Sequence, residues 1–330
     1  MSDDRLQATM AASPTRAADL PTASLGGALD LTDWGLIAAE GPEAAQFLHG
    51  QLTQDVMLLG THEARMAGYC SPKGRLLATF VLWKTSPERV LLACSADVLP
   101  ATLKRLSMFV LRAKVKLSDA SAQWRLVGLA GAQAAEALGA HAPSAPWARA
   151  GLGAACVLRL PDAARVPRWL WAAPRDAEQP PALPPLPEAH WRWLEVMSAV
   201  PRITAPTVDQ FVPQMVNLEA VGGVNFKKGC YPGQEVVARS QYRGTLKRRG
   251  FLLAAPVEAR AGQEVFHSED PSQPCGMVVL AAPDARDEGR WSLFAELKIA
   301  ATGSGSLHLG AADGPALALE PLPYELPPQD

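Results

Sequence analysis

The stretch FVPQMVNLEAVGGVNFKKGCYPGQEVVAR, residues 211–239, is the most distinctive in the chain, because it holds a cysteine in an unusual setting. Cys230 lies within KKGCYPG (227–233), with two lysines before it and proline and glycine after it. Glycine and proline on both sides predict a turn rather than the middle of a helix or strand. Nearby cations favour the thiolate, which is the reactive form of cysteine. The pattern fits a reactive thiol, and it also fits a small apolar filler whose lysines point outward.

The composition of the whole chain is that of an ordinary globular protein. Of its 330 residues, 48% are hydrophobic and 19% are charged, so the chain can bury a large core in two or three domains. The net charge is −2 and the sequence pI is about 6.3. These values argue against a general nucleic-acid or anionic-membrane binder, although a local basic patch remains possible.

The cysteines are odd in number and widely spaced, at positions 70, 94, 156, 230 and 275. Without a C-x-x-C pair or histidines at zinc spacing, neither a disulfide scaffold nor a metal site is expected. Free cysteines are typical of a reducing cytoplasm. Except for Cys230, the cysteines lie in or beside apolar strand-like runs, where core packing is the expected role.

The N-terminal residues 1–28 are interpreted as a flexible tail. They begin with acidic residues and contain no apolar segment of the kind found in secretory signals. No run of 18 or more apolar residues occurs in the chain, so no membrane span is expected.

The middle of the chain predicts a mixture of helices and strands. Residues 178–188, EQPPALPPLPE, are read as an extended proline-rich connector. The expected helices are 41–56, 98–115, 132–139 and 188–201, and the expected strands are 64–70, 76–84, 89–95, 124–131 and 154–160.

From Arg249 onward, short apolar runs follow one another with turn residues between them, which predicts a small β-barrel or sandwich. The domain boundary is expected near 245–250. The expected strands are 250–257, 264–268, 275–283, 291–300, 306–310 and 316–324.

Basic and aromatic residues supply further candidate binding groups. Arg239, Arg243 and Lys247, followed by two more arginines, could bind an anion such as phosphate, nucleic acid or a carboxylate-rich tail, or could form a solvated strand edge. Trp34 and Trp191 could stack on a flat heterocycle or could pack in a core. No nucleotide-binding, zinc-protease or serine-hydrolase motif occurs.

The stretch 211–239 resembles the K-G-C-[FY]-x-G-Q-E signature of the YgfZ family, folate-binding proteins related to the glycine-cleavage T-protein and to mitochondrial iron–sulfur assembly proteins. FLHGQLTQDV (47–56), GYCSPKGRLLATFVLW (68–83), LRAKV (111–115) and LPY (322–324) also fit, so that the resemblance covers about residues 29–325. The signature residues are Lys228, Gly229, Cys230, Tyr231, Gly233, Gln234 and Glu235.

The resemblance implies an α+β, GcvT-like fold, in which residues 29–247 form a folate-binding region of two intertwined lobes and residues 248–330 form a C-terminal β-barrel. It implies a tetrahydrofolate-binding accessory protein that supports assembly or repair of iron–sulfur clusters in client enzymes, including tRNA-thiolating radical enzymes. Trp34 and Trp191 match the folate-contacting tryptophans, and Cys230 matches the functional thiol. The expected ligand is tetrahydrofolate or a derivative, without direct membrane or nucleic-acid binding.

The sequence departs from the T-protein pattern at two places. Leu77 and Ala78 stand where an acidic pair would be, and aliphatic side chains cannot steady a cationic intermediate. Met197 stands where T-proteins have a pterin-binding glutamate, and Glu195 is expected to face another direction. An accessory protein is therefore favoured over a glycine-cleavage aminomethyltransferase. The alternatives are another folate-dependent aminomethyl or methyl transferase, or a tRNA-binding protein that uses the basic residues 239–249.

Overall fold

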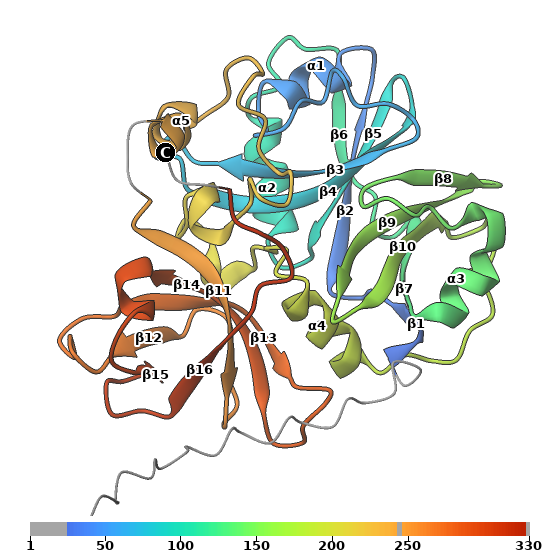
Figure 1. Cartoon of the computed structure of the whole chain (residues 1–330). Coiled ribbons are helices and arrows are strands. Elements are labelled where there is room, and N and C mark those ends of the chain that lie inside the picture. The colour runs from blue at the N-terminus through green and yellow to red at the C-terminus, as the bar shows by residue number, and fades with distance from the viewer. Residues whose placement is uncertain (1–24, 243–245, 328–330) are drawn as a thin grey trace, which may run out of the picture.

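The computed structural model describes residues 25–242 and 246–327, which form two five-stranded sheets and a closed barrel. Figure 1 shows the two sheets side by side, with the barrel below the first sheet and helix α4 (Glu188–Met197) at the junction of the second sheet with the barrel. The predicted α+β class with a C-terminal barrel is confirmed.

The first sheet has apolar side chains on both faces. Phe80 and Leu92 point into a core that includes α1 and α2, whereas Trp83 and Leu91 point into the large central core. Burial on both faces explains why these strands read as nearly continuous apolar runs. In spatial order, the strands are β3 (Ala64–Cys70), β4 (Leu76–Ser86), β5 (Arg89–Ser95), β2 (Trp34–Glu40) and β6 (Lys116–Asp119), and the helices are α1 (Ala44–His49) and α2 (Leu99–Ser107).

The second sheet intertwines with the first along the chain. Its edge strand β1 comes immediately before β2 in sequence, but pairs with β7 rather than with the first sheet. The chain thus starts in the second sheet, builds the first, and returns, which confirms the expectation of intertwined lobes. In spatial order, the strands are β1 (Gly27–Asp30), β7 (Trp124–Ala130), β10 (Val166–Pro174), β9 (Ala155–Ala163) and β8 (Arg149–Leu152), and α3 (Ala132–Leu138) follows β7 in the chain.

The barrel encloses its own apolar core, which includes Leu253, Val265 and Leu293. Closure leaves no free strand edge along the sheet, so backbone groups are paired around the ring. In spatial order, its strands are β11 (Arg248–Ala255), β14 (Trp291–Lys298), β13 (Gly276–Pro283), β12 (Glu264–His267), β15 (Leu307–Leu309) and β16 (Ala316–Glu320).

Two predicted helices are much shorter than the apolar spacing suggested. The helix expected at 41–56 is limited to α1, because the chain then turns so that the Thr53 hydroxyl donates to Gly223 O (2.6 Å) and accepts from Gly68 N (2.7 Å). The helix expected at 98–115 is limited to α2. Beyond it Leu111 has φ +44° and is 87% exposed, so the apolar residues there do not form a buried helical face.

Candidate functional site

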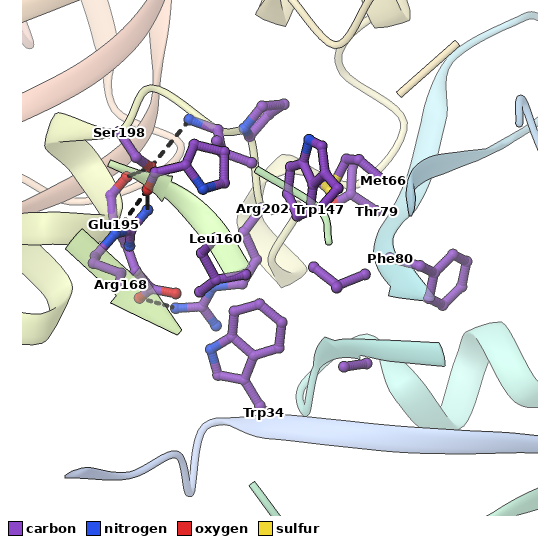
Figure 2. A pocket seen from close by; sticks show the side chains of 15 residues that line it. Trp34, Met66, Thr79, Phe80, Trp147, Leu160, Arg168, Glu195, Ser198 and Arg202 are labelled. Carbon is purple, nitrogen blue, oxygen red and sulfur yellow. Dashed lines mark hydrogen bonds and ion pairs between the residues drawn. The ribbon is translucent and has the colours of Figure 1, made fainter. Parts of the chain in front are cut away.

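A central cavity lies where the first sheet meets the second sheet and the segment that follows α4. Figure 2 shows the side chains of Arg202 and Glu195 gathered at one side of this cavity, near the ring of Trp34. The wall combines aromatic and aliphatic groups with a few charged ones. The lining residues include Trp34, Met66, Thr79, Leu160, Arg168, Glu195 and Arg202.

Arg202 organises the polar part of the cavity. Its guanidinium donates to Glu195 Oε2 (3.1 Å), to Asp33 Oδ2 (2.9 Å) and to Ser95 Oγ (3.2 Å). Its Cζ also lies 5.3 Å from the centroid of the Trp34 ring. The arginine therefore fixes the orientation of the Glu195 carboxylate and of the indole together.

Burial shifts the protonation of these charged groups. Desolvation raises the pKa of Glu195 above its ordinary value, although Arg202 works in the opposite direction. Burial also lowers the pKa of Arg168 to about 10, which leaves this side chain positively charged at neutral pH. For Arg202 burial would lower the pKa, but the neighbouring Glu195 and Asp33 outweigh it and raise the value. The cavity thus holds a carboxylate flanked by two cations.

Trp34 offers a hydrogen-bond donor as well as an aromatic face. Its Nε1 is buried and makes no hydrogen bond of normal geometry among the described residues, although it lies near enough to the Glu195 carboxylate to act against the rise in the pKa of that group. A buried polar group without a partner costs about 1–3 kcal/mol. An acceptor atom on a ligand would remove this cost by pairing with the indole N–H. Because the Glu195 carboxylate can in turn accept from a ligand donor, the wall suits a flat molecule that carries both kinds of group.

Trp191 is not part of the cavity wall. It is 1% exposed, and a Cβ built on Gly128 would lie 2.8 Å from its ring atoms. Arg168 Cζ lies 5.5 Å from the ring centroid. The structure therefore places Trp191 in the core, where it supports Arg168 and has no face exposed for stacking on a ligand.

The cavity corrects one expectation about α4. Glu195 was expected to face away from the ligand site with Met197 in its place, but Glu195 lines the cavity and Met197 does not. The end of α4 adjoins the turn into Arg202, and the ion pair with that arginine holds Glu195 inward. The two positions do face different directions, as expected from their offset, but it is Glu195 rather than Met197 that faces the cavity.

Strand β4 presents a hydroxyl to the cavity rather than an acid. Thr79 lines the cavity and accepts a hydrogen bond from the backbone N–H of Ile203 (3.0 Å). Leu77 belongs instead to a small hollow beside α2, and Ala78 is fully buried in the core beneath the helices. The sequence of β4 contains no aspartate or glutamate, so this strand supplies no carboxylate.

The second candidate region is the segment of residues 225–233, which we call the thiol loop. Within it Cys230 is exposed, whereas the other four cysteines are buried and free, as expected for core residues. Burial raises the pKa of Cys70 and of Cys94 to about 12 and that of Cys156 to about 11. Because burial keeps Cys70, Cys94 and Cys156 protonated and away from solvent, Cys230 is the accessible thiol among the five cysteines.

Two buried side chains anchor the thiol loop on either side of Cys230. The Lys228 ammonium donates to Gly229 O (3.0 Å) and lies 4.6 Å from the ring centroid of Tyr231. Lys228 is 8% exposed and Tyr231 7%, while Gly229 is exposed. Burial lowers the pKa of Lys228 to about 8, and the nearby Asp55 and Cys230 oppose this shift. The ammonium is thus mostly protonated at pH 7, close to the thiol.

Gly233 explains how the loop docks onto the protein. Its φ is +79°, and a Cβ at this position would lie 2.6 Å from Gly74 Cα and would also meet Ser71 O. Only glycine allows the turn 71–74 and the thiol loop to approach this closely. Gln234 then begins helix α5 (Gln234–Tyr242), on which Glu235 is exposed.

The basic residues that follow differ in their exposure and in their partners. Arg239 and Lys247 are exposed, whereas Arg243 lies outside the described residues. Arg249 is 2% exposed and forms an ion pair with Glu219, and Arg248 pairs with Glu296 on β14. Ion pairing therefore removes Arg248 and Arg249 from the expected basic run, whereas the anion or partner patch at Arg239, Arg243 and Lys247 stays a prediction.

The thiol loop and the cavity occupy different places in the fold. Helix α5 lies at the upper left edge of Figure 1, and α4 lies near the junction of the second sheet and the barrel. No residue of 225–242 lines the central cavity. Strand β3 runs between the two regions, since Met66 lines the cavity and Cys70 neighbours Tyr231.

Two kinds of feature are absent from the described ranges. No helix there is long and apolar enough to cross a membrane. Within the same ranges, no three His, Cys, Asp or Glu side chains are grouped so that they could hold a metal ion.

Comparison with known proteins defines the class first. Residues 21–158 match the GCVT N-terminal domain family. The crystal structure of glycine cleavage system aminomethyltransferase T from Bartonella henselae superposes with a TM-score of 0.67 over 92% of this chain and 88% of that one, at 17% identity. The fold is therefore that of the glycine-cleavage T-proteins, as the GcvT-like resemblance implied.

Relatives of similar length then define the family. The tRNA-modifying protein YgfZ of Edwardsiella ictaluri is 33% identical over 315 residues, which cover 91% of this chain and 93% of that protein. Its counterpart from Photobacterium profundum is 35% identical over 236 residues, covering 68% and 69%. The chain belongs to the YgfZ family.

Proposed function

We propose that this protein binds a tetrahydrofolate-type ligand in the central cavity and serves tRNA modification as an accessory protein of iron–sulfur enzymes. The observation that carries the proposal is the cavity wall, where an ion pair joins Glu195 to Arg202 and the guanidinium of Arg202 lies over the ring of Trp34. The family relationship supports it, because relatives at 33–35% identity are named tRNA-modifying proteins.

The cavity has the groups that a reduced pterin requires. A pterin presents an amino group and an adjacent ring N–H along one edge, and a carboxylate can accept both. Glu195 is the carboxylate that lines the cavity, and Arg202 favours its ionised form and fixes its direction. Trp34 adds an aromatic face and an unpartnered N–H. A bound folate would supply a one-carbon carrier, and the protein residues would bind and orient it.

Binding is favoured over one-carbon transfer by the absence of a second acid. Transfer through a cationic intermediate requires a carboxylate near the reacting nitrogen. Strand β4 carries none, and Glu195, the one carboxylate among the described residues that line the cavity, is assigned to the pterin edge. We therefore favour an accessory role over an aminomethyl or methyl transferase.

Cys230 is the proposed point of action on client enzymes. An iron–sulfur cluster usually needs four thiolates or their equivalents, so one exposed cysteine acts on a cluster only together with groups from another molecule. The five free cysteines are consistent with a reducing cytoplasm as the place of action.

The ligand is tested by titrating a reduced folate while following tryptophan fluorescence and heat. Saturable quenching is expected, and Trp34→Phe should remove most of the quenching that the ligand causes, whereas Trp191→Phe should retain it. Tight or moderate binding by calorimetry supports the proposal. No binding at millimolar ligand contradicts it.

The accessory role is tested by complementation in a bacterium that lacks its own family member. Wild type should restore thiolated tRNA, and Cys230→Ala and Cys230→Ser should not, because neither replacement supplies a thiol. Cys275→Ser is a matched control at a buried cysteine. Normal tRNA thiolation by folded Cys230→Ala would remove Cys230 from the proposal.

A further inference from the structure

A second hollow shares the residue Trp34 with the wall of the central cavity. It has a volume of about 610 Å³, which is in the range of small-molecule sites. Trp34 and Trp124 supply aromatic surface, while Arg125 and Arg175 supply positive charge. We call this space the arginine hollow.

The two arginines of this hollow differ in their partners. Arg125 donates to both carboxylate oxygens of Asp30 (2.6 and 2.9 Å) and to Gln179 Oε1 (2.8 Å), so its charge is compensated. Arg175 is exposed, and within residues 25–242 and 246–327 it forms no ion pair. With one aspartate against two arginines, the lining carries a net positive charge that Arg175 presents.

The other large hollow beside the cavity has the opposite balance. It measures about 510 Å³ and shares Glu195 and Arg202 with the cavity. Its lining holds four carboxylates and three arginines, and Arg202 is already bound to two of those carboxylates. An anionic group leaving the cavity would therefore be repelled on this side and attracted on the side of Arg175.

We propose that the arginine hollow binds the carboxylate-bearing tail of the ligand, a chain of γ-linked glutamates, while the heterocycle occupies the central cavity. This inference rests on the proposed folate binding and assigns the direction in which the ligand leaves the cavity. Trp34 lines both spaces, so the ring that joins pterin and glutamate can pass along it towards Trp124. Each added glutamate brings one carboxylate, which an exposed arginine attracts in a salt-dependent way.

The test compares monoglutamyl and pentaglutamyl tetrahydrofolate by calorimetry at low and high salt. With wild type the pentaglutamate should bind about three- to tenfold more tightly, and the gain should shrink at high salt. Arg175→Gln should reduce the gain to less than twofold. Arg192→Gln, which removes an arginine that lines the other hollow, should leave the gain unchanged.

The outcomes distinguish failure of the tail site from failure of folate binding as a whole. Equal affinity for both ligands in wild type, or an unchanged gain in Arg175→Gln, overturns the tail site but leaves folate binding intact. Loss of the gain in Arg192→Gln instead assigns the tail to the other hollow and overturns the inference. Failure of both ligands to bind overturns the proposed folate function, and the tail site with it.

Discussion

The thiol loop is one short segment at the surface, whereas the central cavity is a partly open space whose wall comes from segments far apart in the chain. Cys230 is displayed between two anchors, Lys228 and Tyr231, that lie within two residues of it. By contrast, the Arg202–Asp33 ion pair of the cavity joins residues 169 positions apart. Local sequence can specify the first arrangement, but only the folded chain brings the second together.

This difference suggests two separable tasks. In the cavity, burial raises the pKa of Glu195 and an ion pair with Arg202 balances its charge, which suits the binding of a small ligand. The thiol loop exposes the thiol of Cys230, which suits contact with another protein. The two regions are joined through β3 and the central core. Variants that change one region and leave the other unaffected will show whether the tasks are independent.

The largest expected effect concerns the docking of the thiol loop. Gly233→Ala should lower the free energy of unfolding by about 3 kcal/mol, because positive φ and the close approach of Gly74 both oppose a side chain. Gly222 has φ +78° with no atom within 4 Å of a built Cβ, so Gly222→Ala should cost only about 1 kcal/mol. Urea denaturation measures both, and equal losses would mean that the close approach does not matter.

Replacing the cavity carboxylate should weaken folate binding without affecting the thiol. Glu195→Gln removes a charged acceptor, and such hydrogen bonds are worth about 1.5–3 kcal/mol, or roughly 10- to 100-fold in affinity. Glu188→Gln, on the exposed face of the same helix, should have no effect. Calorimetry checks the affinities; unchanged binding by Glu195→Gln would exclude a direct contact with the ligand.

The same carboxylate should make binding depend on pH. The pKa of Glu195 is raised by burial, so it takes up a proton at a higher pH than an exposed glutamate does. Protonation removes the ionised acceptor, and affinity should fall as pH is lowered through this raised value. Glu195→Gln should show no such step. A wild-type affinity that is flat down to the ordinary pKa of glutamate would contradict this prediction.

A smaller effect is expected on the reactivity of Cys230. Lys228→Met should slow its alkylation by iodoacetamide about three- to tenfold at pH 7, because the thiolate loses a nearby positive charge. The difference should vanish above about pH 8, where Lys228 itself loses its proton. Lys227→Met is the matched control at an exposed lysine and should change the rate less. Folate affinity should be the same in all three proteins.

The smallest expected effect is on stability. Cys230→Ala should change the free energy of unfolding by less than about 0.5 kcal/mol, because an exposed thiol packs against little. Cys94→Ala should cost about 1 kcal/mol, since Cys94 is fully buried in the core of the first sheet. Thermal melts distinguish the two. A large loss in Cys230→Ala would favour a packing role for this cysteine.

Much of the fold could be read from local sequence. The strands at 64–70 and 89–95 and the strands of the barrel were bounded by glycine, proline and polar turns, and the structure has them within a few residues. Strand β10 and helix α5 were not predicted. The helix expected at 98–115 was too long, because apolar residues such as Leu111 continue its spacing but face solvent.

By itself, the sequence determined the family, the turn that exposes Cys230 and the barrel, because each depends on neighbouring residues whose conformational preferences are local. Only the tertiary structure decided which tryptophan and which carboxylate form the cavity. Trp34 and Trp191 look alike in sequence, yet Gly128 and Arg168 enclose Trp191, whereas Trp34 lines the cavity. Glu195 faces inward because Arg202 pairs with it, and such a contact exists only after α4 has packed between the sheets and the barrel.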